Sequence, residues 1–164
     1  MKRTAALLIC LALTALALGG CAAEKEEKAV EKGLGLELSG VTHISAYDSH
    51  GGFNGDGVSF IALTFVEGGL EQQLAADPAW QSLPADETAQ ALMWGVEDEA
   101  GSTGPLLTGS DGQPLVPAVQ AGYYRLIDRH SDTQTPILER GSFNFTVGVY
   151  DADARILYYC ELDT

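Results

Sequence analysis

Two short segments of the chain combine histidine and aspartate at a spacing that suits metal binding. Asp128, His130 and Asp132 alternate along the chain, and Asp48 and His50 do the same in an earlier segment. Side chains two residues apart on a β-strand point to the same face. If the two segments meet at one edge of a sheet, two imidazoles and three carboxylates converge, a donor set adequate for Zn²⁺ or a similar cation. The alternative is that both are polar strand ends that hydrogen-bond their own loops.

A divalent cation bound by this set is the one cofactor that the sequence suggests, and neither half matches a strong metal motif. Asp48-Ser49-His50 also contains the residue types of a hydrolytic triad. Consecutive residues cannot stack their side chains into a nucleophile–base–acid relay, and no Gly-x-Ser-x-Gly elbow lies nearby. We therefore expect this tripeptide to stabilise a turn, and the sequence assigns no catalytic residue.

Only one of the three cysteines is left for the folded domain. Cys10 lies in an apolar run near the N-terminus, Cys21 follows that run, and Cys160 lies among apolar residues of an expected strand. A single cysteine cannot form an intrachain disulfide. No neighbour would lower the pKa of the Cys160 thiol, so we expect it to be buried and inert.

The N-terminus has the three parts of a bacterial export signal. Lys2 and Arg3 form a basic start, residues 5–18 form an uncharged and mostly apolar run, and Leu18-Gly19-Gly20-Cys21 closes it. The run is too short to span a bilayer as a helix, which needs about 20 apolar residues. It is typical of a secretory signal, and the closing tetrapeptide resembles the lipobox of bacterial prolipoproteins. The alternative is an ordinary secretory signal followed by a chance cysteine.

The resemblance to prolipoproteins implies a lipid anchor. In that family a diacylglyceryl group is attached to the cysteine thiol, and cleavage then exposes the lipidated residue. Carried over to this chain, the modified residue is Cys21 and the cut lies between Gly20 and Cys21. Two or three acyl chains anchor firmly, because each buried methylene contributes about 0.8 kcal/mol. The implied location is the extracytoplasmic face of the cell membrane or of the outer membrane.

Acidic residues dominate the chain outside the signal. The precursor has nine basic and 23 acidic residues and a net charge of −14, and loss of the two basic residues of the signal brings the net charge near −16. No lysine follows Lys32, and neither lysine nor arginine occurs again before Arg125. A surface of that sign repels nucleic acid and anionic lipid headgroups. We therefore expect no nucleic-acid partner, and we expect the lipid to hold the protein on the membrane.

The chain divides into a signal peptide at 1–20, a charged tether at 21–32 and a single globular domain at 33–164. The tether is short of large apolar side chains, as is typical of a linker. The domain is long enough for one sizeable core and too short for two ordinary domains.

Strand patterns surround a helical region in the domain. Helix spacing of Leu70 and Leu74 predicts one helix, Asp77-Pro78 predicts a helix start, and Pro84-Ala85-Asp86-Glu87 starts a further helix. Residues 97–113 are expected to form a loop or a small hairpin. The expected strands are 36–48, 58–66, 122–128, 143–150 and 155–162.

This order of elements favours an α+β fold, with an antiparallel sheet of about five strands and one or two helices packed on one face. An immunoglobulin-like β-sandwich is the alternative, and it would require the helical region to be an insertion.

The domain itself is similar to small, uncharacterised lipid-anchored proteins of bacteria in the segments 49–56, 122–132 and 143–164. That resemblance brings no activity with it. The first hypothesis is a non-enzymatic membrane-anchored lipoprotein whose domain binds another envelope protein or an extracellular ligand. The second hypothesis is a metal-assisted hydrolase that uses the Asp/His strand ends.

Overall fold

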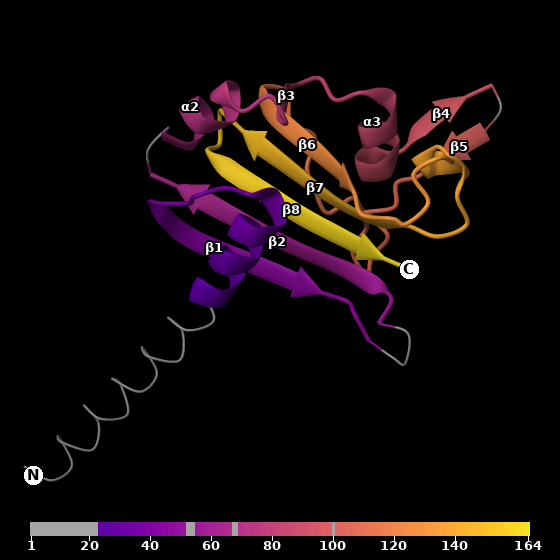
Figure 1. Cartoon of the computed structure of the whole chain (residues 1–164), viewed down its shortest axis with the longest axis horizontal. Helices are drawn as coiled ribbons and strands as arrows, with labels where there is room; N and C mark the ends of the chain where they lie inside the picture. Colours follow the sequence, from indigo (N-terminus) through magenta and orange to yellow (C-terminus); the bar gives the residue numbers. More distant parts are fainter. Residues whose placement is uncertain (1–22, 52–54, 67–68, 100) are drawn as a thin grey trace, which may run out of the picture. The chain divides into compact units, whose positions relative to one another are not determined.

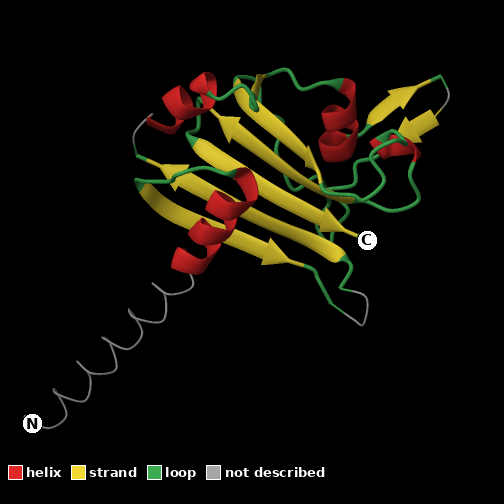
Figure 2. Ribbon diagram, in the orientation of Figure 1, coloured by secondary structure: helices red, strands yellow, loops and turns green. Residues whose placement is uncertain are grey.

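A computed structural model describes residues 23–51, 55–66, 69–99 and 101–164 (Figures 1 and 2). The chain forms two compact units, Met1–Glu37 and Leu38–Thr164, and each is described by itself. None of the helices within the described ranges is long and apolar enough to cross a membrane.

Residues 23–34 of the first unit form an α-helix. Alanine, glutamate and lysine are strong helix formers, and Glu24 and Lys28 form an ion pair one turn apart. Gly35 ends the helix with a φ of 65°, and the amide of Leu36 donates to the carbonyl of Glu31 at 3.1 Å. This is the Schellman arrangement, in which glycine adopts the left-handed conformation. The segment predicted as a charged tether is therefore helical from residue 23 onward.

Six antiparallel strands form the main sheet of the second unit, in the order β1-β2-β8-β7-β6-β3 (Figure 1). They are β1 (Val41–Asp48), β2 (Gly57–Phe65), β3 (Gln81–Ser82), β6 (Gly122–Asp128), β7 (Asn144–Asp151) and β8 (Ile156–Asp163). A separate two-stranded sheet consists of β4 (Val96–Asp98) and β5 (Gly101–Thr103).

The β7–β8 hairpin lies at the centre of the main sheet, and alternation along both strands fixes which of their side chains share a face. Three cross-strand pairs point to the same face and are buried in one apolar cluster. These pairs are Phe145 with Leu162, Val147 with Cys160, and Val149 with Tyr158. The amide of Ala154 donates to Oδ1 of Asp151 at 2.8 Å in the connecting turn. The predicted hairpin and the predicted burial of Cys160 are confirmed.

Helix α3 (Glu87–Trp94) packs into the same apolar cluster as this face of the sheet, and Figure 2 shows it as a short helix beside the strands. Its buried face consists of Ala89, Ala91, Leu92 and Met93. The helix begins after Asp86, whose carboxylate accepts the amide of Ala89 at 2.8 Å. Asp86 is thus the N-cap of the helix that the sequence predicts to start at residues 84–87.

The helix start predicted at Asp77-Pro78 is wrong. The first helix of this region, α2 (Gly69–Ala76), ends just before it. Oδ1 of Asp77 accepts the amide of Ala79 at 2.9 Å, and the Asp77 carbonyl accepts the amide of Trp80 at 3.0 Å, so the chain turns here. The next two residues form β3 and pair with β6. That pairing uses backbone groups that a helix would need for its own hydrogen bonds.

The α+β fold class is confirmed, and the sheet is an open one rather than a β-sandwich. It has six strands where about five were predicted, because the two residues of β3 add an edge strand. β4 and β5 pair with each other in the region where a loop or a small hairpin was expected. A short 3-10 helix, η1 (Ile137–Glu139), lies in the connection between β6 and β7.

Candidate functional site

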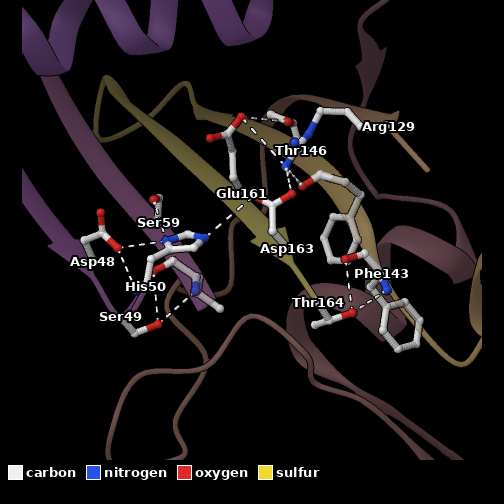
Figure 3. A network of polar contacts seen from close by, with 12 residues as sticks. Asp48, Ser49, His50, Ser59, Arg129, Phe143, Thr146, Glu161, Asp163 and Thr164 are labelled. Atoms are coloured by element: carbon white, nitrogen blue, oxygen red, sulfur yellow. Dashed lines mark hydrogen bonds and ion pairs between the residues drawn. The ribbon is translucent and has the colours of Figure 1, made fainter. Parts of the chain in front are cut away.

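One edge of the sheet collects most of the polar residues singled out in the sequence. β1, β6 and β8 end at this edge with Asp48, Asp128 and Asp163. The backbone pairing continues past the strands, since the amide of Arg129 donates to the carbonyl of Asn144 at 2.7 Å. Asn144 pairs with Asp163, and Asp163 pairs with Gly57 beside His50. The row therefore runs across the sheet from Arg129 to His50 (Figure 3).

His50 lies between two carboxylates. Its Nδ1 is 2.8 Å from Oδ1 of Asp48, and its Nε2 is 3.6 Å from Oδ2 of Asp163. The same Asp48 oxygen accepts the backbone amide of His50 at 2.8 Å. Ser49 holds the hairpin closed, because its Oγ accepts the amide of Val58 at 2.8 Å. The tripeptide 48–50 thus has the turn-stabilising role that we expected.

Ser59 brings a hydroxyl to His50, but the geometry is not that of a hydrolytic relay. Ser59 Oγ lies 3.3 Å from Nδ1, which is also the nitrogen that faces Asp48. A relay requires the nucleophile and the carboxylate on opposite nitrogens of the ring, so that one orients the imidazole while the other gives up its proton. Nε2 faces a second carboxylate instead. The described groups therefore do not activate Ser59.

Arg129 links the acidic end of β8 to β6 and β7. Its Nη2 lies 3.0 Å from Oδ1 of Asp163 and 3.9 Å from Oε1 of Glu161, and it donates to the carbonyl of Phe145 at 3.2 Å. Thr146 Oγ1 donates to the same Glu161 oxygen at 3.3 Å. This network was not predicted. The sequence did hold a signal for this network. Glu161 and Asp163 are two positions apart near the end of the chain, and Arg129 directly follows an expected strand.

Asp128 forms an ion pair with Arg140. Oδ2 of Asp128 lies 2.7 Å from Nη2 of Arg140, and Oδ1 accepts Nη1 at 2.9 Å, so the pair is bidentate. The hydrogen bond from Arg140 lowers the pKa of Asp128, although partial burial acts in the opposite direction. Nε of Arg140 also donates to the carbonyl of Thr135 at 2.8 Å. The connection from β6 to β7 is thereby tied to the end of β6.

His130 and Asp132 also bond within their own loop. Nδ1 of His130 accepts the amide of Asp132 at 3.0 Å, which leaves Nε2 as the donor to Ser142 Oγ at 3.0 Å. Hydrogen bonds from the Thr135 hydroxyl and from the amides of Gln134 and Thr135 lower the pKa of Asp132 to about 2. Both imidazole nitrogens are therefore occupied, and neither is free to bind a cation.

The five residues of the metal hypothesis share one edge of the sheet but do not converge. β2, β8 and β7 lie between β1 and β6. At about 4.8 Å per strand, His50 and His130 are on the order of 15–20 Å apart, whereas ligands of one Zn²⁺ each lie about 2 Å from it. Within the described ranges, no three His, Cys, Asp or Glu side chains are placed to hold a metal ion together. Local sequence spacing does not reveal the order of strands in a sheet. It therefore could not show that the predicted ligands lie apart. These ligands are Asp48, His50, Asp128, His130 and Asp132.

The remaining candidate residues are Cys160 and the predicted cleavage and lipidation site. Cys160 is fully buried, and burial raises the pKa of its thiol. Nothing next to it would stabilise the thiolate that nucleophilic chemistry needs. Gly20 and Cys21, the predicted cleavage and lipidation residues, lie outside the described residues.

A cleft of about 190 Å³ lies at the side of the domain that carries α3. Trp94 lines it, and the indole is fixed because its Nε1 donates to the carbonyl of Val116 at 3.0 Å. Ligand pockets for whole small molecules are about 300–1,000 Å³. This cleft is smaller, and its size suits one or two side chains of a protein partner. The other lining residues are Leu83, Pro84, Ala85, Gln90, Ala118, Val119 and Gln120.

The 118–120 segment leaves hydrogen-bonding groups at the rim of the cleft. Ala118 and Gln120 are exposed, whereas Val119 is buried. In the described part of the chain, no backbone amide or carbonyl of these three residues is hydrogen-bonded to another protein group. An apolar floor beside unpaired backbone groups is an arrangement by which proteins recognise peptide segments. Sequence patterns gave no sign of this cleft, because its two sides, residues 83–94 and 118–120, are at least 24 positions apart in the chain.

Comparison of the chain with protein-family models, with curated proteins and with solved structures finds no match. The functional argument therefore rests on the N-terminal motif and on the geometry of the domain.

Proposed function

We propose that the protein is a lipid-anchored, extracytoplasmic lipoprotein whose domain binds another protein of the cell envelope. The observation that carries the proposal is the N-terminal pattern, a basic start and an apolar run that closes with Leu18-Gly19-Gly20-Cys21. Small residues before the cysteine suit a narrow peptidase pocket. Acyl chains on Cys21 would supply a membrane anchor that the acidic domain could not provide by charge.

The arrangement of the domain favours binding over catalysis. His50, His130 and the carboxylates at the edge of the sheet are engaged in hydrogen bonds and ion pairs that hold loops. The cleft beside Trp94 combines a fixed aromatic ring with backbone groups at 118–120 that pair with no group of the described residues. Aromatic rings in pockets are frequent anchors of protein interfaces. We therefore place the partner's docking segment in this cleft.

The anchor is tested by metabolic labelling with palmitate in the bacterial cell. Label should enter the wild-type protein and should be absent from a Cys21→Ala variant. Cys10→Ala is the matched control and should be labelled like the wild type, because that residue lies within the signal. Label that survives Cys21→Ala would refute the anchor.

The docking site is tested by covalent capture of envelope proteins in intact cells. An arginine at Ala118, which is exposed and lines the cleft, should block the partner without disturbing the core. Ala46→Arg is the matched control, since Ala46 is exposed on β1, the outermost strand on the side of the sheet away from β6 and β3. A partner captured by the wild type and by Ala46→Arg should be lost with Ala118→Arg. Equal capture by both variants would rule out the cleft as the docking site.

A further inference from the structure

Three lysines lie on one face of the helix at residues 23–34. Lys25, Lys28 and Lys32 are three and four positions apart, and such residues share a helix face. All three side chains are exposed, whereas Val30 and Leu34 are buried on another face of the helix. We refer to these lysines as the lysine face.

The lysine face contains every lysine of the chain beyond the signal. Residues 33–164 hold four arginines and nineteen acidic residues, a net charge of −15, and no lysine. The lysine face begins four positions after Cys21, which is within about 14 Å even for a fully extended chain. The lysines of the chain beyond the signal are thus confined to the segment beside the predicted anchor, where four glutamates accompany them and give residues 21–32 a net charge of −1.

We propose that the lysine face binds the anionic phospholipid headgroups of the membrane that holds Cys21. This inference rests on the proposed lipidation, because three lysines alone would hold the protein only weakly. A lysine close to an anionic bilayer surface gains a factor of about five in binding, equivalent to about 1 kcal/mol. Once the acyl chains confine the helix to the surface, that factor decides how the helix lies rather than whether the protein is bound. The acidic domain is repelled by the same surface.

Glu24 moderates the effect. It is the one acidic residue of the helix that is exposed, and it forms an ion pair with Lys28. The other glutamates of the helix, Glu26, Glu27 and Glu31, are partly buried. Removing the charge of Glu24 should therefore strengthen the attraction of the lysine face to anionic lipid.

The test measures the acetylation rate of the lysines by a water-soluble N-hydroxysuccinimide ester, read by mass spectrometry. The full lipidated protein is placed in vesicles of phosphatidylcholine, or of phosphatidylcholine mixed with phosphatidylglycerol. Acetylation in the mixed vesicles should be slower by about fivefold and should recover at high salt, which screens the charges. Equal rates in the two kinds of vesicle would overturn the proposal.

Variants separate the lysine face from other causes of slow acetylation. Glu24→Gln should slow the reaction further in the mixed vesicles, and Lys25→Gln combined with Lys32→Gln should restore the rate at Lys28. Glu139→Gln removes an exposed carboxylate of the domain and should leave the rates as in the wild type. If Glu139→Gln acts like Glu24→Gln, overall charge rather than the lysine face is responsible, and the proposal fails.

The two proposals fail in different ways. A protein that does not sediment with phosphatidylcholine vesicles has no lipid anchor, and the inference about the lysine face then falls with the proposed function. A protein that sediments with both kinds of vesicle, and whose lysines react equally in both, keeps its anchor and loses only the lysine face.

Discussion

The guanidinium of Arg140 lies 2.7 Å from the carboxylate of Asp128, and the arginine side chain is only 5% exposed. The pair joins the end of β6 to the residue that precedes the 141–143 turn into β7. A carboxylate that the metal hypothesis counted as a ligand therefore fastens the connection at residues 129–143 between β6 and β7. The ion pair also makes the stability of the domain fall as the pH becomes acidic.

Asp128→Asn should lower the free energy of unfolding at neutral pH by about 1 kcal/mol. This is less than a fully buried charged hydrogen bond would contribute, because the carboxylate is about one-third exposed. Arg140 lowers the pKa of Asp128, so the carboxylate contributes stability above its ordinary pKa of 3.8 and loses that contribution as the pH falls further. Urea unfolding at neutral pH and below pH 3.8 measures the difference. It should shrink at the acid pH.

The exposed carboxylate of Asp153, in the β7–β8 turn, provides the control. Asp153→Asn should leave the free energy of unfolding unchanged at both pH values. A loss for Asp128→Asn that is equally large in acid would show that the ion pair is not its cause.

Tyr124→Phe should cost about 1–3 kcal/mol in the free energy of unfolding. The hydroxyl of Tyr124 accepts the amide of Asp86 at 3.1 Å and lies 2.9 Å from Oε1 of Gln81, so it joins β6 to the start of α3 and to β3. Its removal leaves a partly buried amide without a partner. Tyr123→Phe is the matched control on the opposite face of the same strand, and should have little effect. Denaturant unfolding of the two variants gives the comparison, and equal losses would contradict this account.

Tyr150→Phe should be neutral or slightly stabilising. The side chain of Tyr150 is completely buried, and its hydroxyl has no hydrogen-bond partner within the described ranges. A buried hydroxyl without a partner costs free energy, and the phenyl ring keeps the same packing without it. Denaturant unfolding of Tyr150→Phe beside Tyr124→Phe is the measurement. A loss for Tyr150→Phe as large as that for Tyr124→Phe would show that its hydroxyl is bonded in solution.

Much of the sheet was predictable because its signals are local. β6 has the bounds that the sequence predicts, and the alternation in β7 and β8 fixes which residues face the core. The helix expected to start at residues 84–87 forms, with Asp86 as its cap, whereas the helix start predicted at Asp77 was overridden when the next residues paired with β6. A cap residue specifies a local hydrogen bond, and tertiary pairing decides whether a helix follows it.

The candidate site was less predictable because it depends on strand order. Alternation placed Asp48 and Asp128 correctly at strand ends, His50 and His130 lie two positions beyond them in loops, and both ends lie at one edge of the sheet. It could not show that three other strands lie between them. The contact of Arg129 with Asp163 and the cleft beside Trp94 likewise join residues far apart in the chain.

The buried tyrosines should make the fold sensitive to alkali. Burial raises the pKa of Tyr124, Tyr150, Tyr158 and Tyr159. A pKa raised on folding contributes stability below the ordinary value of 10.0 and loses it as the pH rises further. Unfolding in urea as a function of pH, followed together with phenolate absorbance, should show stability falling above pH 10.0. Free titration of all the tyrosines near that pH in the folded protein would contradict the burial.

The lipid anchor is the central claim, and mass spectrometry of the N-terminal peptide from purified membranes tests it most directly. The account predicts that the mature chain begins at Cys21 and that this residue carries a diacylglyceryl group. A mature chain that begins at another residue, or a Cys21 with an unmodified thiol, would contradict it.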